Sequence, residues 1–262
     1  MKIATWNING VKARIDGLTK WLAQSSPDVV CLQEIKSVDE GFPAGPVEDM
    51  GYNVAVHGQK GFNGVAILSR LPFDEIVKGL PGDGGDVQAR YLEAVFSVGG
   101  GVVRVASIYL PNGNPVDSEK FDYKLAWMKR LDAHIRGRLA FEEPAVFCGD
   151  YNVIPQPDDA EFPDKWTGDA LFQPASRSAF QALLNLGLTD AYRACHPGER
   201  EYTFWDYQAG AWQKNNGIRI DHMLLTPQAA DRLVSCEIQK FTRSWEKPSD
   251  HVPVVIELDE TA

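Results

Sequence analysis

Short apolar runs alternate along the chain with segments of helical spacing, and this pattern predicts a layered fold of strands and helices. Apolar or alternating runs predict strands at residues 2–8, 28–33, 52–57, 64–69, 91–98, 102–110, 144–149, 219–225, 234–240 and 252–258. Helical spacing is found at residues 14–25, 118–139 and 176–187. The middle segment has an apolar face made of Leu125, Trp127, Met128, Leu131 and Ile135. We therefore expect an α/β or α+β fold.

No repeat, low-complexity tract or linker interrupts this pattern. A length of 262 residues fits one large domain or two small ones. The stretch 154–175 contains several Pro and Asp residues and predicts a long loop. Because long loops in compact domains are often functional, this stretch is a candidate part of a site.

The composition is that of an ordinary globular protein, with 44% hydrophobic and 24% charged residues. No apolar run approaches the roughly 18 residues that a membrane span needs. The first ten residues, MKIATWNING, predict a strand and lack the apolar segment of a signal peptide. The four cysteines lie far apart and form no CxxC pair, which argues against zinc and redox motifs. Free thiols are typical of a reducing compartment, so we expect a cytoplasmic protein without membrane association.

The net charge of −10 is unusual for a protein that binds nucleic acid. An acidic enzyme with a small-molecule substrate is one interpretation. The other is that a local basic face binds DNA, since binding depends on the field at one face and not on the total charge. Composition leaves both interpretations open.

Polar residues stand at the ends of several predicted strands, where loops of layered α/β proteins gather their sites. They are Asn7, Glu34, Tyr109, Asp150, Asn152, Asp221, Asp250 and His251. Each has a structural explanation when taken alone; Asp250, for example, follows Ser249 and can cap a turn. Together they offer the carboxylates that Mg²⁺ prefers and an imidazole, which suits phosphodiester hydrolysis.

Six motifs in order carry a resemblance to a known family. They are TWNING at 5–10, LQEIK at 32–36, GQKGFNGVAILS at 58–69, GDYN at 149–152, GIRIDH at 217–222 and KPSDHVPV at 247–254. The chain resembles the exonuclease III family of AP endonucleases, within the endonuclease/exonuclease/phosphatase superfamily. FWDY at 204–207 is particular to the DNA-repair branch. The resemblance implies one domain over residues 1–262, folded as a four-layer sandwich of two mixed β-sheets with helices on both outer faces.

The resemblance also implies roles for the residues at the strand ends. Glu34, Asn7 and Asp250 match the metal site, which takes Mg²⁺ or Mn²⁺. Asp150 and Asn152 match the residues that position the attacking water. Tyr109 and His251 match phosphate-contacting residues, and Asp221 matches the carboxylate that orients the histidine. The motif GDYN has Tyr151 where Phe or Met is more usual, and we expect this side chain to point into the core.

Contacts with DNA are implied for an aromatic pair and for basic residues. Phe204 and Trp205 match a pocket for a flipped abasic sugar, although ordinary core packing is the competing interpretation. Arg90 and Lys247 are predicted to contact DNA. Further candidate phosphate contacts are Lys36, Lys60, Lys124, Lys214 and Arg219, each of which can equally be a solvated surface charge. His222 has no role that the sequence reveals.

The function implied is that of a DNA-repair phosphodiesterase. It cleaves double-stranded DNA 5′ to abasic sites, acts on 3′-damaged ends, and can support 3′→5′ exonuclease activity from the same centre. We expect a monomer. A superfamily phosphatase or phospholipase acting on inositol or lipid phosphates is the alternative. A catalytically silent DNA-binding module is a third class, and the complete set of polar residues argues against it.

Overall fold

Two mixed sheets of six strands each form the centre of the molecule in the computed structural model, which describes residues 1–99 and 101–259. The first sheet contains β1 (Lys2–Asn7), β2 (Val29–Gln33), β3 (Asn53–His57), β4 (Val65–Ser69), β11 (Leu233–Ile238) and β12 (Val254–Leu258). The second contains β5 (Glu75–Lys78), β6 (Tyr91–Val98), β7 (Gly101–Tyr109), β8 (Ala145–Asp150), β9 (Thr189–Asp190) and β10 (Asp221–Leu225). Their strand orders are β11-β12-β1-β2-β4-β3 and β5-β6-β7-β8-β10-β9.

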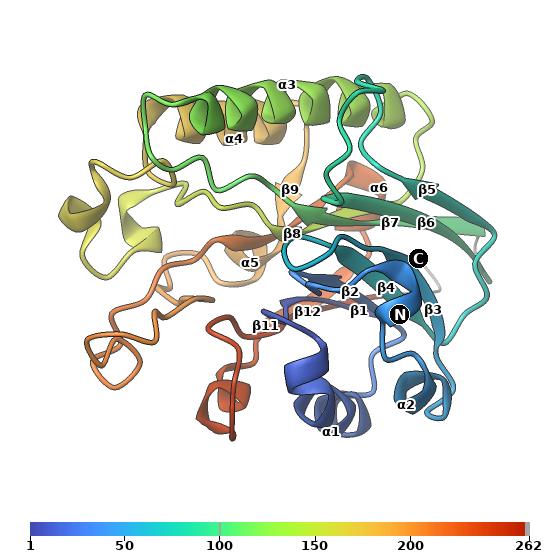
Figure 1. The fold of residues 1–262 in the computed structure, drawn as a ribbon. Coiled ribbons are helices and arrows are strands. Elements are labelled where there is room, and N and C mark those ends of the chain that lie inside the picture. Colours follow the sequence, from blue (N-terminus) through green and yellow to red (C-terminus); the bar gives the residue numbers. More distant parts are fainter. Residues whose placement is uncertain (100, 260–262) are drawn as a thin grey trace.

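Helices cover the outer face of each sheet (Figure 1). The helices are α1 (Ile15–Ser25), α2 (Gly45–Glu48), α3 (Glu119–Leu139), α4 (Pro174–Asn185), α5 (Ala191–Cys195) and α6 (Pro227–Ala230). Trp21 and Val47 join α1 and α2 to the first sheet, while Trp127 and Phe180 join α3 and α4 to the second. The layers therefore run helix, sheet, sheet, helix, which confirms the predicted four-layer sandwich.

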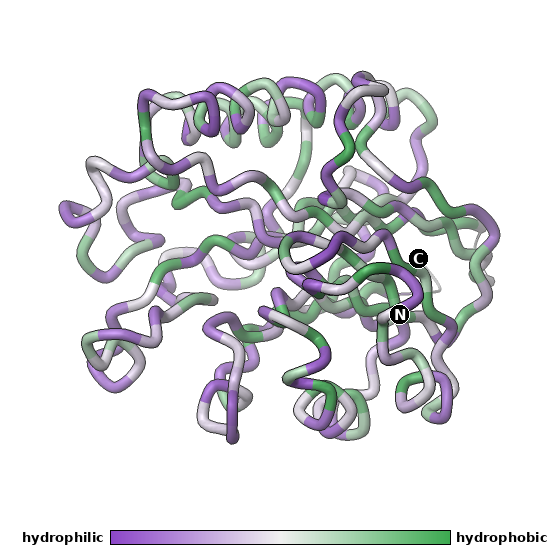
Figure 2. Tube along the Cα trace, in the orientation of Figure 1, coloured by the Kyte–Doolittle hydropathy of each residue, from purple (hydrophilic) through white to green (hydrophobic). Residues whose placement is uncertain are grey.

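The strands at the centre are buried on both faces. This burial explains their largely hydrophobic composition (Figure 2). In β2 every residue is buried: Val29 and Cys31 contribute to the core between the sheets, while Val30 and Leu32 pack in the layer with α1. Strands covered on both sides read as continuous apolar runs and not as an alternation. This is why the sequence pattern identified them.

The predicted strands and helices agree with the structure to within about two residues at most ends. The pattern missed β5, an edge strand whose residues are mostly exposed, and β9, which has two residues. It also missed the short helices α2, α5 and α6. The stretch 154–175 is largely a loop, as expected, with 3-10 turns at Pro157–Asp159 and Pro163–Trp166. Among the helices of the described residues, none has the length and apolar character required to span a membrane.

The topology brings several strand ends to one end of the sandwich. β1 runs parallel to β2, and β7 runs parallel to β8, so the carboxyl ends of each pair lie together. β10 starts opposite the end of β8, with Asp221 in register with Asp150. The segment before β12 reaches the same region, because β12 is antiparallel to β1. Polar residues far apart in sequence thus meet here.

Candidate active site

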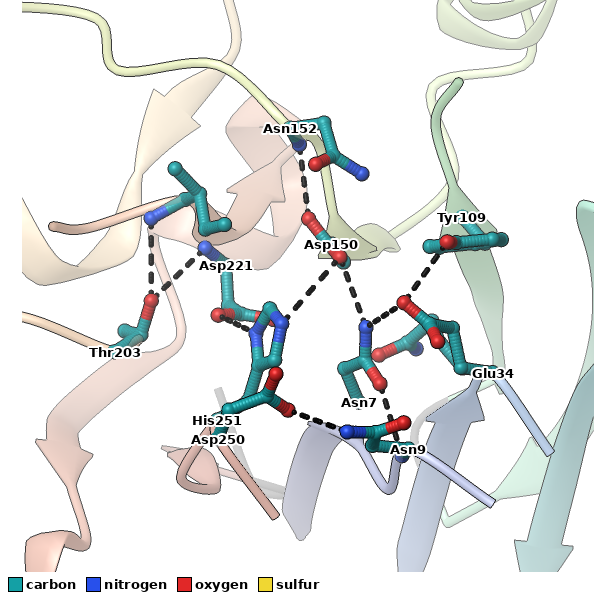
Figure 3. Close-up of polar contacts among 12 residues, drawn as sticks. Asn7, Asn9, Glu34, Tyr109, Asp150, Asn152, Thr203, Asp221, Asp250 and His251 are labelled. Carbon is teal, nitrogen blue, oxygen red and sulfur yellow. Dashed lines mark hydrogen bonds and ion pairs between the residues drawn. The ribbon is translucent and has the colours of Figure 1, made fainter. Parts of the chain in front are cut away.

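Asp150 stands at the centre of a polar cluster formed by the strand ends (Figure 3). The residue is 1% exposed. Oδ2 accepts a hydrogen bond of 2.9 Å from Nδ2 of Asn7 and lies 3.8 Å from Nε2 of His251. Oδ1 accepts a hydrogen bond of 2.9 Å from the backbone N–H of Asn152. Each oxygen of the Asp150 carboxylate therefore accepts a hydrogen bond.

The Asp150 carboxyl titrates close to neutral pH. Burial raises its pKa, and the nearby carboxylates of Asp221 and Glu34 add to this rise. His251 and the hydrogen bond from Asn7 act in the opposite direction, and the resulting pKa is about 7. A carboxylate with such a pKa is suited to act as a general base near neutral pH.

His251 and Asp221 form a tight pair beside Asp150. Nδ1 of His251 lies 2.8 Å from Oδ2 of Asp221, and both side chains are buried. Burial alone would lower the pKa of His251, but the charge and hydrogen bond of Asp221, together with Asp150 and Asp250, raise it to about 10. His251 is therefore an imidazolium at neutral pH, which suits a group that faces phosphate.

Glu34 lies on the other side of Asp150, just past the end of β2. Its Oε1 accepts hydrogen bonds from Nδ2 of Asn7 at 3.1 Å and from the hydroxyl of Tyr109 at 2.8 Å. Its Oε2 lies 3.0 Å from Nζ of Lys36. Burial would raise the pKa of Glu34, but Lys36 and the hydrogen bond from Asn7 bring it below its ordinary value. Glu34 is thus an ionised, partly exposed carboxylate.

Asn9 belongs to this cluster, although the sequence prediction did not include it. Its backbone N–H donates to Oδ1 of Asn7 at 3.0 Å, and its Nδ2 donates to Oδ1 of Asp250 at 3.0 Å. It also accepts a hydrogen bond from Lys36. Asn9 lies inside the motif WNING, so its presence in that motif was the available signal. Thr203 was missed as well: its hydroxyl accepts from the backbone N–H of Asp221.

The donor set fits a hard divalent cation. Glu34, Asp150 and Asp250 offer carboxylate oxygens, which Mg²⁺ and Mn²⁺ prefer. Asn7 directs its Nδ2 at two carboxylates, so only its Oδ1 has the chemistry of a metal ligand. Within the described chain, Oδ1 of Asp221 is buried without a hydrogen-bond partner.

A second acidic grouping overlaps this donor set. Ligand atoms of Asp150, Asp221 and His251 all lie within 4.8 Å of one another. Within this grouping Nδ1 of His251 already pairs with Oδ2 of Asp221 at 2.8 Å.

The predicted DNA-contacting residues have different environments. Phe204 is half-buried, and its ring lies edge-on to His251 with centroids 5.0 Å apart. Arg90 lies over the ring of Tyr109 at 4.9 Å, and Lys247 is exposed. Trp205 departs from the expectation of a sugar-binding pocket. It is fully buried and packs edge-on against Trp212, so it contributes to the core next to the Phe204 segment.

Two of the further basic candidates are not surface residues. Arg219 is buried and forms ion pairs with Asp159 at 2.7 Å and Asp190 at 2.8 Å. This pairing ties the loop at 154–175 to the strand that begins at Asp221. Lys124 is also buried and contacts backbone carbonyls. Neither can contact a phosphate in this arrangement.

His222, which had no assigned role, has a structural one. Burial and the nearby Arg219 lower its pKa to about 4, so it is neutral. Its Nε2 bonds to the carbonyl of Val153 at 3.0 Å, and its Nδ1 lies 3.1 Å from Arg219. Tyr151 points into the core and is fully buried, as predicted.

Comparisons with known proteins agree with this geometry. The model of the Endonuclease/Exonuclease/phosphatase family matches residues 4–251. Exodeoxyribonuclease III of Haemophilus influenzae is 36% identical over 266 residues, covering 98% of this chain and 100% of that protein. An AP endonuclease structure from Archaeoglobus fulgidus has a TM-score of 0.93 at 39% identity, covering 99% of both chains. A structure of the 3′ phosphatase NExo from Neisseria, bound to a product DNA hairpin, has a TM-score of 0.95 at 39% identity and covers 99% of both chains.

Proposed function

The chain belongs to the endonuclease/exonuclease/phosphatase family, and from this premise we propose that it is a metal-dependent DNA-repair phosphodiesterase. Its substrate is double-stranded DNA, which it cleaves 5′ to abasic sites. The same centre acts on 3′-damaged ends and supports 3′→5′ exonuclease activity. Support for DNA over inositol or lipid phosphates comes from the relatives, whose names are those of DNA nucleases.

The observation that carries the proposal is the arrangement of Asp150 beside the His251–Asp221 pair. A carboxylate of pKa about 7 lies 3.8 Å from an imidazole of pKa about 10. Near neutral pH one group accepts a proton while the other carries positive charge toward an anion. Phosphodiester hydrolysis needs these two elements: a base for the water and a cationic donor for the phosphoryl oxygens.

Roles for the individual residues follow from this arrangement. Asp150 orients and deprotonates the attacking water, with Asn152 fixed beside it by the hydrogen bond to Oδ1. His251 binds the phosphate, and Asp221 keeps it protonated and fixed in orientation. Tyr109 places its hydroxyl at the edge of the same site, beside Glu34. Holding these groups in place before the substrate binds lowers the cost of reaching the transition state.

Glu34, Asn7 and Asp250 would hold the cation, which we propose is Mg²⁺, with Mn²⁺ as a substitute. When bound, such a cation neutralises charge on the phosphoryl group and on the leaving oxygen. Asn7 then has two tasks, because its Nδ2 also links Glu34 to Asp150.

The substrate contacts are proposed from exposure and position. Phe204 packs with Ile218 and Ile220 and stands beside His251, so it can line a pocket for a sugar that lacks its base. Arg90 and Lys247 contact the phosphate backbone. We also propose that residues 1–262 act as one domain, because β1 and β12 pair in the first sheet although they lie at opposite ends of the sequence. We further propose that the protein acts as a monomer.

A substrate panel tests the proposal. It compares duplex DNA with one abasic analogue, duplex with 3′-phosphate ends, duplex with intact ends, and inositol phosphates, each with Mg²⁺. We expect the abasic duplex to be cleaved and inositol phosphates to remain intact. Robust turnover of inositol phosphates without cleavage of DNA would contradict the proposal.

A further inference from the structure

Lys124 is a buried lysine in α3, a helix that otherwise faces the second sheet with apolar side chains. It is 0% exposed. Its Nζ donates hydrogen bonds to two backbone carbonyls, that of Asn112 at 3.0 Å and that of Asn152 at 2.6 Å. Burial lowers the pKa of Lys124 to about 7, against the attraction of Asp150 and Asp169. Both protonation states carry N–H groups, so both contacts persist around neutral pH.

The two carbonyls belong to residues that also bond through their side chains. Nδ2 of Asn112 donates to Oδ1 of Asn152 at 3.2 Å, and Nδ2 of Asn152 donates to the carbonyl of Leu110 at 3.0 Å. The amide of Asn152 thus takes its orientation from the segment after β7. Through its hydrogen bonds to the backbone carbonyls of Asn112 and Asn152, Lys124 fixes the relative position of the two backbones. This position determines how the two side chains meet.

Asn152 needs these contacts because its own backbone is unusual. Its φ is 47°, in the left-handed region, which few residues other than glycine adopt and which Asn tolerates better than most. Its N–H is bonded to Asp150 and its carbonyl to Lys124, so the conformation is held from both sides. Removing one of these contacts leaves the conformation less well determined.

The segment that contains Gly113 packs closely against the side chain of Lys124. A Cβ added to Gly113 would lie 2.6 Å from Cδ of Lys124 and 3.3 Å from Cβ of Ala170, and the φ of Gly113 is +88°. The segment therefore wraps closely around the aliphatic part of the lysine. A buried ammonium carries a desolvation cost that an apolar residue in the same place would not. The contacts to Asn112 and Asn152 are what offset this cost.

We propose that Lys124 is a positioning residue for the hydrolytic reaction, acting through Asn152. The inference rests on the proposed function, in which Asn152 helps Asp150 to position the attacking water. Lys124 contacts neither water nor phosphate itself. Its loss should therefore impair the chemical step more than the binding of DNA.

The test is a double-mutant cycle on duplex DNA with one abasic analogue. Lys124→Met keeps an unbranched apolar side chain of nearly the same length but removes the N–H donors. We expect kcat to fall on the order of tenfold while KM changes less than about twofold. In an Asn152→Ala background the same change should alter kcat less than about twofold, because the residue it acts through is absent. Lys129→Met, at an exposed position of α3, is the matched control and should leave kcat unchanged.

An equal fall in kcat in both backgrounds would overturn the inference, since it would show a general structural effect. Unchanged kcat in Lys124→Met would overturn it as well. If Lys124→Met does not fold by circular dichroism, Lys124→Leu, which also lacks N–H donors, goes through the same cycle, with the same coupling expected. Absence of cleavage by the unmodified protein would contradict the proposed function instead, so the two failures are distinguishable.

Discussion

Asp221→Asn removes the charge that holds His251 as an imidazolium while preserving the shape of the side chain. Among the groups that raise the pKa of His251 from 6.5 to about 10, Asp221 has the largest effect. In the unmodified protein nearly every molecule therefore carries the imidazolium at about pH 7.5. If the pKa of His251 returned to its ordinary value, roughly one molecule in ten would remain protonated at that pH. We expect kcat near pH 7.5 to fall by at least about tenfold.

The same substitution should move the pH optimum downward. The unmodified protein needs Asp150 ionised, above a pKa of about 7, and His251 protonated, below a pKa of about 10. Asp221 raises the pKa of both groups, so its loss lowers both limits of the active range. Activity of Asp221→Asn should therefore recover as the pH decreases through about 7, where that of the unmodified protein declines.

The assay is single-turnover cleavage of a fluorescent duplex with one abasic analogue, measured across this pH range at a fixed concentration of Mg²⁺. Asp231→Asn, an exposed change after α6, serves as the matched control and should keep the original profile. A variant that loses activity by the same factor at every pH would refute the reasoning. So would an unchanged rate near pH 7.5.

Three further results are expected. His251→Ala and Asp150→Asn should each lower kcat by about 10²-fold or more, through loss of transition-state stabilisation, and steady-state kinetics with near-normal turnover would remove that residue from the mechanism. EDTA should abolish cleavage and added Mg²⁺ or Mn²⁺ should restore it, because Glu34 and its neighbours offer oxygen ligands; full activity in EDTA would exclude the cation. DNA affinity, measured by fluorescence anisotropy, should fall with rising salt despite the net charge of −10. A flat salt profile would mean that Arg90 and Lys247 do not form a phosphate-binding face.

The fold was predictable where burial dictates composition. Strands such as β2 and β8 are covered on both sides, so their apolar runs carry the signal, and the long helix α3 shows its buried face directly. The edge strand β5 has four residues and is largely exposed, so it lacks the continuous buried apolar run that marks the central strands. Short elements such as β9 bury too little surface to leave a periodic pattern.

The sequence predicted the site as a set of polar residues at strand ends. It did not predict the environment of each residue. Lys124 and Arg219 have the composition of surface cations, and only the structure reveals that their partners are buried carbonyls and carboxylates. Trp205 lies in a motif beside Phe204, yet alternation along the chain directs it into the core. Charge, position and partner depend on contacts between distant segments, which no local pattern encodes.

Mapping the cleavage position in a duplex with a single abasic analogue tests the central proposal most directly. Both strands are labelled, the products are sized by mass spectrometry, and the reaction is run with Mg²⁺ and with EDTA. We expect one cut immediately 5′ to the abasic position, with Mg²⁺ and not with EDTA. An intact abasic strand, or cleavage without preference for the abasic position, would contradict the proposal.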